Sequence, residues 1–285
     1  YATIYTVVIN AALDPLFIYG FGWGIRGAAI ATVLAQVIAL IWQFHILSDK
    51  SELLHFRRGI YRLRRKIVRD ILAIGMSPFL MNLAAGFIVI LINKGLKQYG
   101  GDLMIGAYGI VNRLAFFFVM IVMGINQGMQ PIAGYNFGAR QYDRVRNGVR
   151  VCMAMAAGVT LVISVVFYNA AEPLFRLFSQ DDAVVAVGVG MMHVLTPVYI
   201  TYISIEVLSG ALRGCGDVRV PTLITVFFVC GLRVLWLTLM VPRYHTIATV
   251  ELSYPLTWTL ASLLFILYYK RGGWLNRCKA AKGLE

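Results

Sequence analysis

The residues that could do chemistry in this sequence are the few charged side chains that interrupt long apolar runs. Glu206 is the sole charged residue among the 30 positions between Asp182 and Arg213. A carboxylate inside a bilayer costs about 3 kcal/mol or more, so such a group usually binds an ion, carries a proton or has a polar partner. We therefore predict that Glu206 binds and releases an ion, with a structural hydrogen bond or salt bridge as an equally favoured alternative.

Three further charged residues lie inside such runs. Arg233 is close to the midpoint of the run 220–242, where a guanidinium needs a partner. Glu251 and Glu206 each lie about 10 Å away from it in depth, so we expect a structural pair with one of them in preference to contact with a substrate. Arg113 lies nearer the end of its run, and its side chain is expected to extend to the membrane surface.

Neutral polar side chains gather near the end of one apolar run. Asn126, Gln127 and Gln130 lie beside a glycine and a proline, Gly128 and Pro131. These amides either line a cavity or form hydrogen bonds between helices, and the sequence favours neither. Aromatic and sulfur-containing side chains precede them, at Phe116, Phe117, Phe118, Met120 and Met123. Such polarisable groups suit organic cations, although we expect most of them to pack against lipid.

Several kinds of chemistry are excluded by what the sequence lacks. It has no G-x-S-x-G, no H-E-x-x-H and no close pair of intramembrane aspartates. Its four cysteines are far apart and have no histidine at metal-ligand spacing: Cys152, Cys215, Cys230 and Cys278. The net charge of +13 is not concentrated in a nucleic-acid-binding motif. We therefore expect no enzyme activity, no metal or other cofactor, and no nucleic-acid partner.

The elements that must position these residues are transmembrane helices. Apolar residues make up 59% of the 285 positions and charged residues 14%, and the mean hydropathy is +0.74. Soluble chains have about 45–50% apolar and 25% charged residues. A bilayer core about 30 Å thick needs about 20 helical residues. Seven runs are long enough: 27–48, 71–93, 103–139, 151–171, 183–212, 220–242 and 244–269.

The fold class predicted is therefore an all-α integral membrane protein, a bundle of seven complete spans and part of an eighth. Barrel strands would be about 10 residues long and would alternate in polarity, and these runs do not. Residues 1–13 are apolar but too short to span, so we expect the sequence to begin partway through a helix.

The distribution of cations predicts the orientation. Of the 26 Lys and Arg residues, 19 fall on one side of the predicted spans and 5 on the other. The positive-inside rule then places the loop 49–69 and the tail 271–285 in the cytoplasm, and the protein in the cytoplasmic membrane. The basic stretch 55–70 alternates cations with apolar residues, which predicts a helix lying on the anionic inner leaflet.

Prolines and glycines inside the runs favour a bundle of kinked and closely packed helices. Proline removes one backbone hydrogen bond, and glycines four residues apart let two helices approach closely. The prolines are Pro78, Pro131, Pro197, Pro221 and Pro255, and the glycine pairs are Gly124/Gly128, Gly134/Gly138 and Gly210/Gly214. This pattern is more typical of a protein whose helices move than of an inert membrane anchor.

Several segments resemble the multidrug and toxic compound extrusion (MATE) family of secondary transporters. Asn10–Gln36 contains LDPLFI and G-x-G-I-x-G-A-A-x-A-T, similar to the junction of helices five and six in that family. Ala107–Ala139 runs AYGIVNRLAFFF and then GINQGMQPIAGYNFGA, and Ser209–Pro221 reads SGALRGCGDVRVP. A weaker match covers Leu232–Pro242. The segments fall in the family's order and cover nearly the whole chain.

The resemblance implies twelve helices in two lobes of six, of which this chain holds the end of helix five to helix twelve. Residues 1–48 would end the N-terminal lobe, 49–69 would link the lobes, and 70–270 would form the C-terminal lobe. It also implies export of drugs, organic cations or metabolites in exchange for H⁺ or Na⁺ by alternating access. The expected partners are the lipid bilayer, a small cationic or amphipathic substrate, and an N-terminal lobe without which the chain would not export.

The resemblance also points to particular side chains. Some members of the family carry acids in the seventh and tenth helices. The run 71–93 here has only Asn82 and Asn93 as polar residues of interest, and Tyr202 stands where the tenth-helix acid is expected, one turn from Glu206. The candidates for the substrate cavity are therefore Asn82, Asn93, Gln127, Gln130, Tyr202 and Arg233. Whether H⁺ or Na⁺ is the coupling ion stays open.

Two other functions compete with export. A flippase for lipid-linked oligosaccharides shares this architecture, but it would need a strongly cationic central cavity, and Arg113 and Arg233 are the intramembrane cations here. The other alternative is a membrane scaffold that transports nothing.

Overall fold

The chain is helical and forms two compact units. The computed structural model describes residues 2–50, 55–56, 63–244 and 246–281, and no strand occurs among them. The first unit is Tyr1–Asp70 and the second is Ile71–Glu285. Each unit is described by itself below.

The first unit is a helical hairpin. It consists of α1 (Ala2–Pro15), the π-helical turn η1 (Leu16–Gly20) and α2 (Gly24–Ser48). The residues of α2 that are buried are all small and lie four apart: Gly27, Ala31, Ala35 and Ala39. Small residues at this spacing form one stripe and let the partner helix come close. At Gly27 the approach leaves no room for a side chain, since a Cβ there would lie 2.7 Å from the carbonyl oxygen of Phe17.

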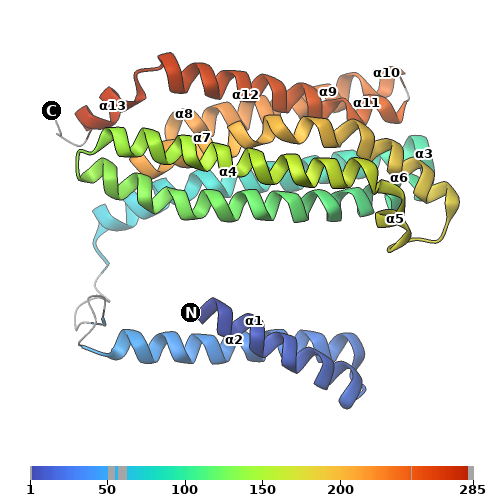
Figure 1. Cartoon of the computed structure of the whole chain (residues 1–285), viewed down its shortest axis with the longest axis horizontal. Helices are drawn as coiled ribbons and strands as arrows, with labels where there is room; N and C mark the ends of the chain where they lie inside the picture. Colours follow the sequence, from blue (N-terminus) through green and yellow to red (C-terminus); the bar gives the residue numbers. More distant parts are fainter. Residues whose placement is uncertain (1, 51–54, 57–62, 245, 282–285) are drawn as a thin grey trace. The chain divides into compact units, whose positions relative to one another are not determined.

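The second unit begins with a long helical segment that reverses direction. α3 (Arg65–Gly138) contains Gly101, whose φ of 66° and ψ of −163° are not helical. This left-handed backbone is readily adopted only by glycine. It divides α3 into two membrane spans, Phe79–Gln98 and Gly100–Gly138. In Figure 1 the first of these runs toward the end labelled α3 and the second runs back from it.

The remaining elements build four more spans and an amphipathic end. They are α4 (Tyr142–Asn169), α5 (Ala171–Arg176), α6 (Asp182–Leu195), η2 (Thr196–Val198), α7 (Tyr199–Cys215), α8 (Arg219–Ile224), η3 (Thr225–Gly231), α9 (Leu232–Leu239), α10 (Val241–Tyr244), α11 (Ile247–Glu251), α12 (Ser253–Arg271) and α13 (Trp274–Ala281). The 3₁₀ turn η2 joins α6 to α7, and the π-helical η3 joins α8 to α9.

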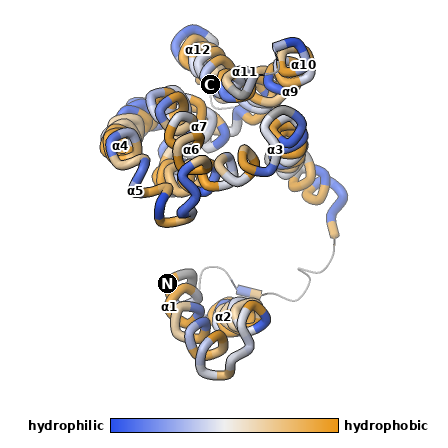
Figure 2. The backbone as a smooth tube through the Cα atoms, turned by 90° about the vertical axis from the view of Figure 1, so that its right-hand side faces the viewer, coloured by the Kyte–Doolittle hydropathy of each residue, from blue (hydrophilic) through white to orange (hydrophobic). Residues whose placement is uncertain are grey.

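Seven helical segments in the part of the chain that the structure describes are long and apolar enough to cross a membrane. They are Gly24–Ser48, Phe79–Gln98, Gly100–Gly138, Tyr142–Asn169, Asp182–Cys215, Arg219–Tyr244 and Ala248–Arg271, and a shorter apolar helix covers Ile4–Gly20. Apolar residues run along all of these helices (Figure 2). The predicted fold class is confirmed, and each predicted run overlaps one of these segments.

The prolines act differently from one another. Pro197 lies in the 3₁₀ turn η2, whereas Pro221 lies in the first turn of α8, four residues before the π-helical η3. Pro131 and Pro255 lie inside the regular helices α3 and α12. Of these four prolines, Pro197 is the one whose missing N–H group coincides with a change of helix type.

Three of the predicted glycines lie where α3 and α7 cross. A Cβ on Gly134 would lie 2.9 Å from the carbonyl oxygen of Gly214, and one on Gly214 would lie 2.7 Å from that of Gln130. Gly210 lies on the same face of α7, one turn earlier. In contrast, a Cβ on Gly124, Gly128 or Gly138 would meet nothing within 4 Å. The crossing of α3 and α7 therefore uses only part of the predicted glycine pattern.

The predicted surface helix 55–70 lies mainly outside the described residues, because 57–62 are not described. The described residues resume at Leu63, and α3 begins at Arg65 with Arg65, Lys66 and Ile67 exposed. The helix on the inner leaflet stays a prediction.

Candidate functional site

A cavity of about 630 Å³ lies inside the second unit. It is bounded by both spans of α3, by α7, by the α8–η3 segment and by α12. Its lining is mostly apolar and aromatic, with a few amides and one residue of each charge: Met81, Asn82, Ala85, Met123, Gln127, Gln130, Tyr202, Ile205, Glu206, Ser209, Arg213, Val218, Thr225, Val229, Cys230 and Trp258. Pockets of this composition commonly bind small organic molecules.

Glu206 is the carboxylate of this cavity, and three side chains surround it. The amide of Asn126 donates a hydrogen bond to its Oε1 atom at 2.8 Å, and the hydroxyl of Tyr202 donates one to Oε2 at 3.3 Å. The Nη2 atom of Arg213 lies 3.9 Å from Oε1. The side chain of Glu206 is 16% exposed and that of Arg213 is 23% exposed. The carboxylate is thus stabilised from several sides and still reaches the cavity.

The spacing of residues along α7 explains why Tyr202 and Arg213 lie beside Glu206. Tyr202, Glu206, Ser209 and Arg213 follow one another at steps of four, three and four. A helix with 3.6 residues per turn places such positions on one face. All four line the cavity. The polar stripe of α7 therefore faces inward over its last three turns.

The crossing of α3 and α7 at these glycines explains how Asn126 reaches Glu206. Asn126 is 1% exposed and belongs to α3, on the far side of the crossing. A Cβ on Gly210 would come within 1.9 Å of its Oδ1 atom, so only glycine leaves space for this amide. Because α7 carries no side chain there, Asn126 reaches Glu206 on the neighbouring turn. A buried acid without this donor would lose a charge-assisted hydrogen bond.

The predicted cavity residues are placed unequally. Asn82, Gln127, Gln130 and Tyr202 line the cavity with Glu206. Asn93 does not line it, since it lies 11 residues beyond Asn82, about 16 Å along the same helix. The expectation that Asn93 is a cavity residue stays a prediction, because the cavity described here occupies only one end of this span.

Arg233 also lies outside the cavity lining, and its predicted pairing with a carboxylate is wrong. Its Nη2 atom donates to Oγ1 of Thr257 at 2.7 Å, and its Cζ atom lies 4.0 Å from the centre of the Tyr254 ring. The ring of Trp258, which does line the cavity, is 5.7 Å away.

Aromatic faces explain why no acid is needed here. Arg233 is 6% exposed, and the negative face of an aromatic ring attracts a guanidinium most strongly where water is excluded. The hydroxyl of Tyr254 is 2.5 Å from that of Tyr108, which fixes the ring. The partner of the buried cation is thus a hydroxyl and a pair of ring faces.

The other two intramembrane charges lie apart from the cavity. Arg113 is exposed on α3, in keeping with a side chain that extends to the membrane surface. Glu251 is half-buried at the end of α11.

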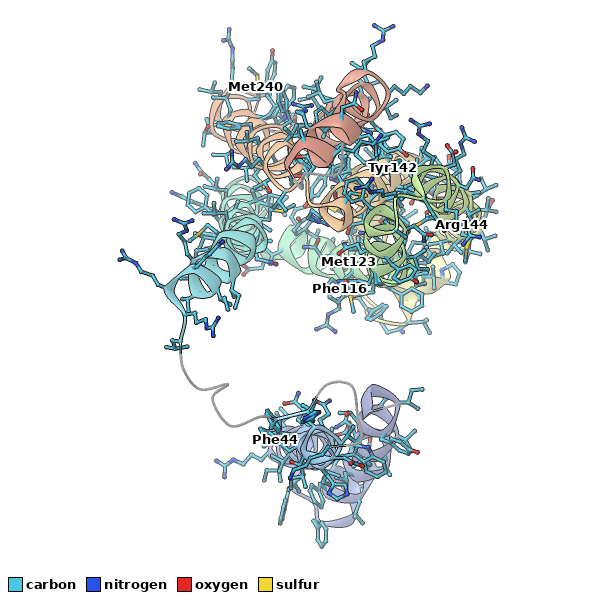
Figure 3. The ribbon with its side chains drawn as sticks, turned by 90° about the vertical axis from the view of Figure 1, so that its left-hand side faces the viewer. Phe44, Phe116, Met123, Tyr142, Arg144 and Met240 are labelled. Carbon is cyan, nitrogen blue, oxygen red and sulfur yellow. The ribbon has the colours of Figure 1, made fainter. Side chains whose placement is uncertain are left out.

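The aromatic run predicted from the sequence is partly buried. Phe118 is fully buried, and its ring stacks on that of Tyr199 with the ring centres 4.4 Å apart. Phe116, labelled in Figure 3, is 62% exposed.

Arg213 is the member of the site that sequence reasoning missed. It was counted among the cations of the inner face, yet it also lines the cavity and faces Glu206. Its separation of seven residues from Glu206 is two helical turns, which is the signal that could have found it. Its Nη1 atom also contacts the sulfur of Met81 at 4.0 Å, which links α7 to the first span of α3.

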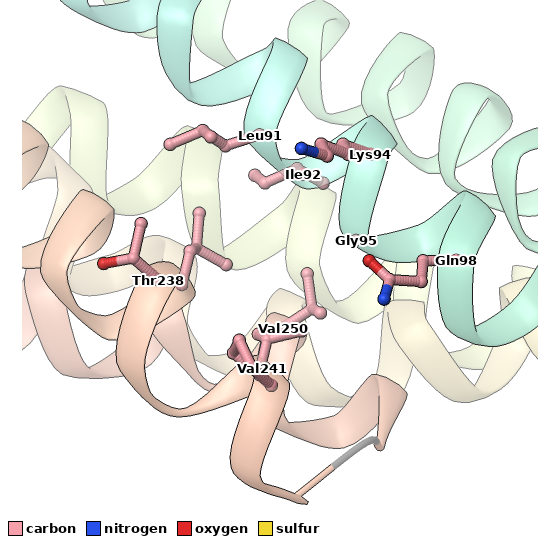
Figure 4. A pocket seen from close by; sticks show the side chains of 10 residues that line it. Leu91, Ile92, Lys94, Gly95, Gln98, Thr238, Val241 and Val250 are labelled. Atoms are coloured by element: carbon pink, nitrogen blue, oxygen red, sulfur yellow. The ribbon is translucent and has the colours of Figure 1, made fainter.

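A second and smaller hollow of about 220 Å³ lies at the other end of the second unit (Figure 4). It is formed by the end of the Phe79–Gln98 span and by α9 and α10, and Lys94 and Gln98 are its longest polar side chains. Among its lining residues Lys94 is the charged one.

These features define a polytopic helical membrane protein with a polar cavity among its spans. The MatE family model matches residues 75–237. The chain belongs to this family of membrane transporters.

Relatives and solved structures are similar to the chain over different lengths. The multidrug export protein MepA of Staphylococcus saprophyticus is 28% identical over 222 residues, which is 78% of this chain and 49% of that protein. MepA of Staphylococcus haemolyticus is 29% identical over 78% of this chain and 48% of its own length. The chain thus spans about half the length of these relatives.

Solved structures agree on the fold. A transporter of the MOP superfamily from Pyrococcus furiosus superposes with a TM-score of 0.87 at 18% identity, over 98% of this chain and 62% of that one. A multidrug resistance MATE family transporter in an outward-facing conformation gives a TM-score of 0.86, also at 18% identity and over the same shares. The match to the MatE family model over residues 75–237 confirms the predicted family membership.

Proposed function

We propose that the chain is part of an efflux transporter that exports small cationic or amphipathic organic compounds in exchange for H⁺ or Na⁺. It would act by alternating access in the cytoplasmic membrane, with its basic tail in the cytoplasm. Membership of the family, relatives named multidrug export proteins, and a cavity that holds a carboxylate all support this proposal. Because those relatives are about twice as long, residues 70–270 are proposed as one lobe of a two-lobe transporter.

The observation that carries the proposal is Glu206 in the cavity wall. Its carboxylate has an amide and a hydroxyl as donors, and its one cationic neighbour, Arg213, is 3.9 Å away. A proton, a sodium ion or an organic cation that enters the cavity would compete with Arg213 for the same two oxygens. One group that accepts either ion or substrate is the simplest way to couple their opposite movements.

The rest of the lining suits such a substrate. Met81, Met123 and Trp258 present polarisable and aromatic surfaces to the cavity, and these attract organic cations without fixed geometry. Charge in the lining is balanced between Glu206 and Arg213. A flippase for anionic lipid-linked sugars would be favoured by an excess of cations, which this lining lacks.

The test is efflux of a cationic dye from vesicles that contain the full-length protein, under an imposed H⁺ or Na⁺ gradient. We expect Glu206→Gln to lower gradient-driven efflux at least tenfold, because the amide keeps the shape of the side chain and removes its charge. The gradient that drives the wild type identifies the ion.

The matched control is Glu172→Gln, an exposed acid of α5 that pairs with Arg176 at 3.0 Å, away from the cavity. This control should retain wild-type coupling. Gradient-driven efflux that is unchanged in Glu206→Gln would remove this residue from the mechanism.

A further inference from the structure

A basic pocket of about 460 Å³ lies at one end of the second unit, outside the cavity described above. It is formed by the α3–α4 turn, the start of α4 and the amphipathic α13. Four of its lining residues are cations and one is an acid: Arg140, Gln141, Tyr142, Asp143, Arg144, Arg146, Leu275 and Lys279. This concentration of positive charge is not used by the proposed transport mechanism.

The positive charges in this pocket are incompletely compensated, and Arg140, Arg144 and Arg146 are exposed. Asp143 lies 3.6 Å from Arg146, and among the described residues neither Arg140 nor Arg144 forms an ion pair. The ammonium of Lys279 lies 4.1 Å from the centre of the Tyr142 ring. The hydroxyl of Tyr142 is buried and has no hydrogen-bond partner in the described part of the chain. A ligand with oxygen acceptors would match the donors of this arrangement.

α13 packs against the end of α12, so the position of Lys279 in the pocket is fixed by side-chain contacts. Trp274 is 4% exposed, stacks on Tyr269 and donates from Nε1 to the Tyr269 carbonyl oxygen at 3.1 Å. Arg277 lies over the ring of Tyr268. These contacts fix the helix that carries Lys279 against the end of α12.

The position of the pocket matches the level of lipid headgroups. Tyr142 is the first residue of the span Tyr142–Asn169, and α13 follows directly after the span Ala248–Arg271. Figure 3 looks onto this end of the helices, where Tyr142 lies among them and Arg144 lies at the edge. A phosphate at this level sits between water and hydrocarbon.

An apolar track leads from the pocket into the membrane. Val151, Met155 and Val162 follow Arg144 at intervals of 7, 11 and 18 residues, which places all four on one face of α4. These three side chains are 58%, 56% and 64% exposed. A cation followed by exposed apolar side chains on one face matches a phospholipid, with the headgroup at Arg144 and an acyl chain along α4.

We infer that this pocket binds the phosphate of an anionic phospholipid, held by Arg140, Arg144 and Lys279. The apolar track favours a lipid over a free phosphate, because a small anion would gain nothing from it. No covalent step is involved, and the site is separate from the cavity at Glu206.

The test is native mass spectrometry and thermal unfolding of the purified protein with defined lipids. Phosphatidylglycerol should remain bound and raise the melting temperature, whereas phosphatidylcholine and inorganic phosphate should do neither. Arg144→Gln combined with Lys279→Gln should weaken phosphatidylglycerol binding roughly 20- to 30-fold, at about fivefold for each cation lost. Arg144→Lys combined with Lys279→Arg should retain binding and shows that the fold tolerates change at both positions.

The control removes the same charge from outside the pocket, by Lys270→Gln with Arg271→Gln at the end of α12. This variant should bind phosphatidylglycerol as the wild type does. An equal loss in the control would mean a diffuse surface attraction and would overturn the proposal. If inorganic phosphate raised the melting temperature as much as phosphatidylglycerol does, the pocket would bind free phosphate and the lipid proposal would be wrong.

Discussion

At the scale of single residues, the intramembrane charges Glu206 and Arg233 are stabilised in different ways. Glu206 has a cation and two neutral donors and faces a cavity. Arg233 has a hydroxyl and aromatic faces and lies outside the cavity lining. Glu206 can exchange partners because it faces the cavity, whereas Arg233 does not face it and holds helices together.

Arg213 is expected to weaken the binding of cations by competing for Glu206. Replacing it by glutamine should tighten the binding of a cationic dye by a factor of about 1.4 to 5, since a partly exposed ion pair contributes roughly 0.2–1 kcal/mol. A fluorescence titration of the purified protein measures the effect. The control is Arg219→Gln, an exposed cation on the other side of the α7–α8 turn. Weaker dye binding in Arg213→Gln would instead mean that the guanidinium is needed for binding.

Tyr254 is expected to matter for stability through Arg233. The change Tyr254→Leu removes the ring face 4.0 Å from the guanidinium and the hydroxyl next to Tyr108. We expect a loss of about 2–3 kcal/mol, because a desolvated cation–π contact contributes about 2 kcal/mol and a hydrogen bond about 1 kcal/mol. Thermal unfolding in detergent measures this loss.

The comparison for this variant is Tyr244→Leu, since Tyr244 is 61% exposed. The comparison variant should unfold close to the wild-type temperature. Equal melting temperatures for Tyr254→Leu and the wild type would show that Arg233 is stabilised by other groups.

At the scale of elements, the crossing of α3 and α7 positions the site. Gly214 lies against the backbone of Gln130, where a Cβ would be 2.7 Å from the carbonyl oxygen. Gly214→Ala must therefore push the two helices apart and should cost about 1–3 kcal/mol of stability. Gly124→Ala adds a Cβ that meets nothing within 4 Å and should stabilise by about 0.5–1 kcal/mol through helix propensity. Thermal unfolding of both variants tests this; a stable Gly214→Ala would contradict it.

The elements were largely predictable from the sequence, and the reason is the bilayer. Hydrocarbon forces each span to be long, apolar and helical, so runs such as 183–212 are visible without any knowledge of packing. Helix type within a span is not forced in this way. Pro131 and Pro221 look alike in the sequence, yet only the second lies beside a π-helical turn.

The site was only partly predictable, because side-chain partners depend on how spans pack. Glu206 was found because a lone acid in an apolar run is costly wherever it points. The partner of Arg233 was predicted wrongly because depth in the membrane says nothing about which helix is adjacent. Asn126 reaches Glu206 only through the gap at Gly210, and that gap belongs to the crossing of two helices.

At the scale of the whole molecule, the distribution of charge predicts how the chain sits in the membrane. The described end that carries Arg140, Arg144 and α13 is rich in cations, whereas the α5–α6 turn at the other end contains Arg176 with Glu172 and Asp182. The positive-inside rule places the first end in the cytoplasm.

Labelling of single cysteines tests this orientation after the four native cysteines, all buried, are replaced. An impermeant maleimide should label Gln180→Cys in intact cells, because this position lies in the exposed α5–α6 turn. It should label Asn276→Cys, on the exposed side of α13, only after permeabilisation. The reverse pattern would contradict both the orientation and the proposed direction of export.

The π-helical turn at Thr225–Gly231 gives this span one residue more than a regular α-helix would need to reach the same orientation. Removing one residue from this turn would let the segment close into an ordinary α-helix, and the helix beyond it would keep its direction. Arg233 would still face Thr257 and Tyr254, its contacts in the native fold. In a regular α-helix the same deletion would rotate every later residue by about 100°. A one-codon deletion between Thr225 and Gly231 would therefore be tolerated where the same deletion elsewhere in the span would not.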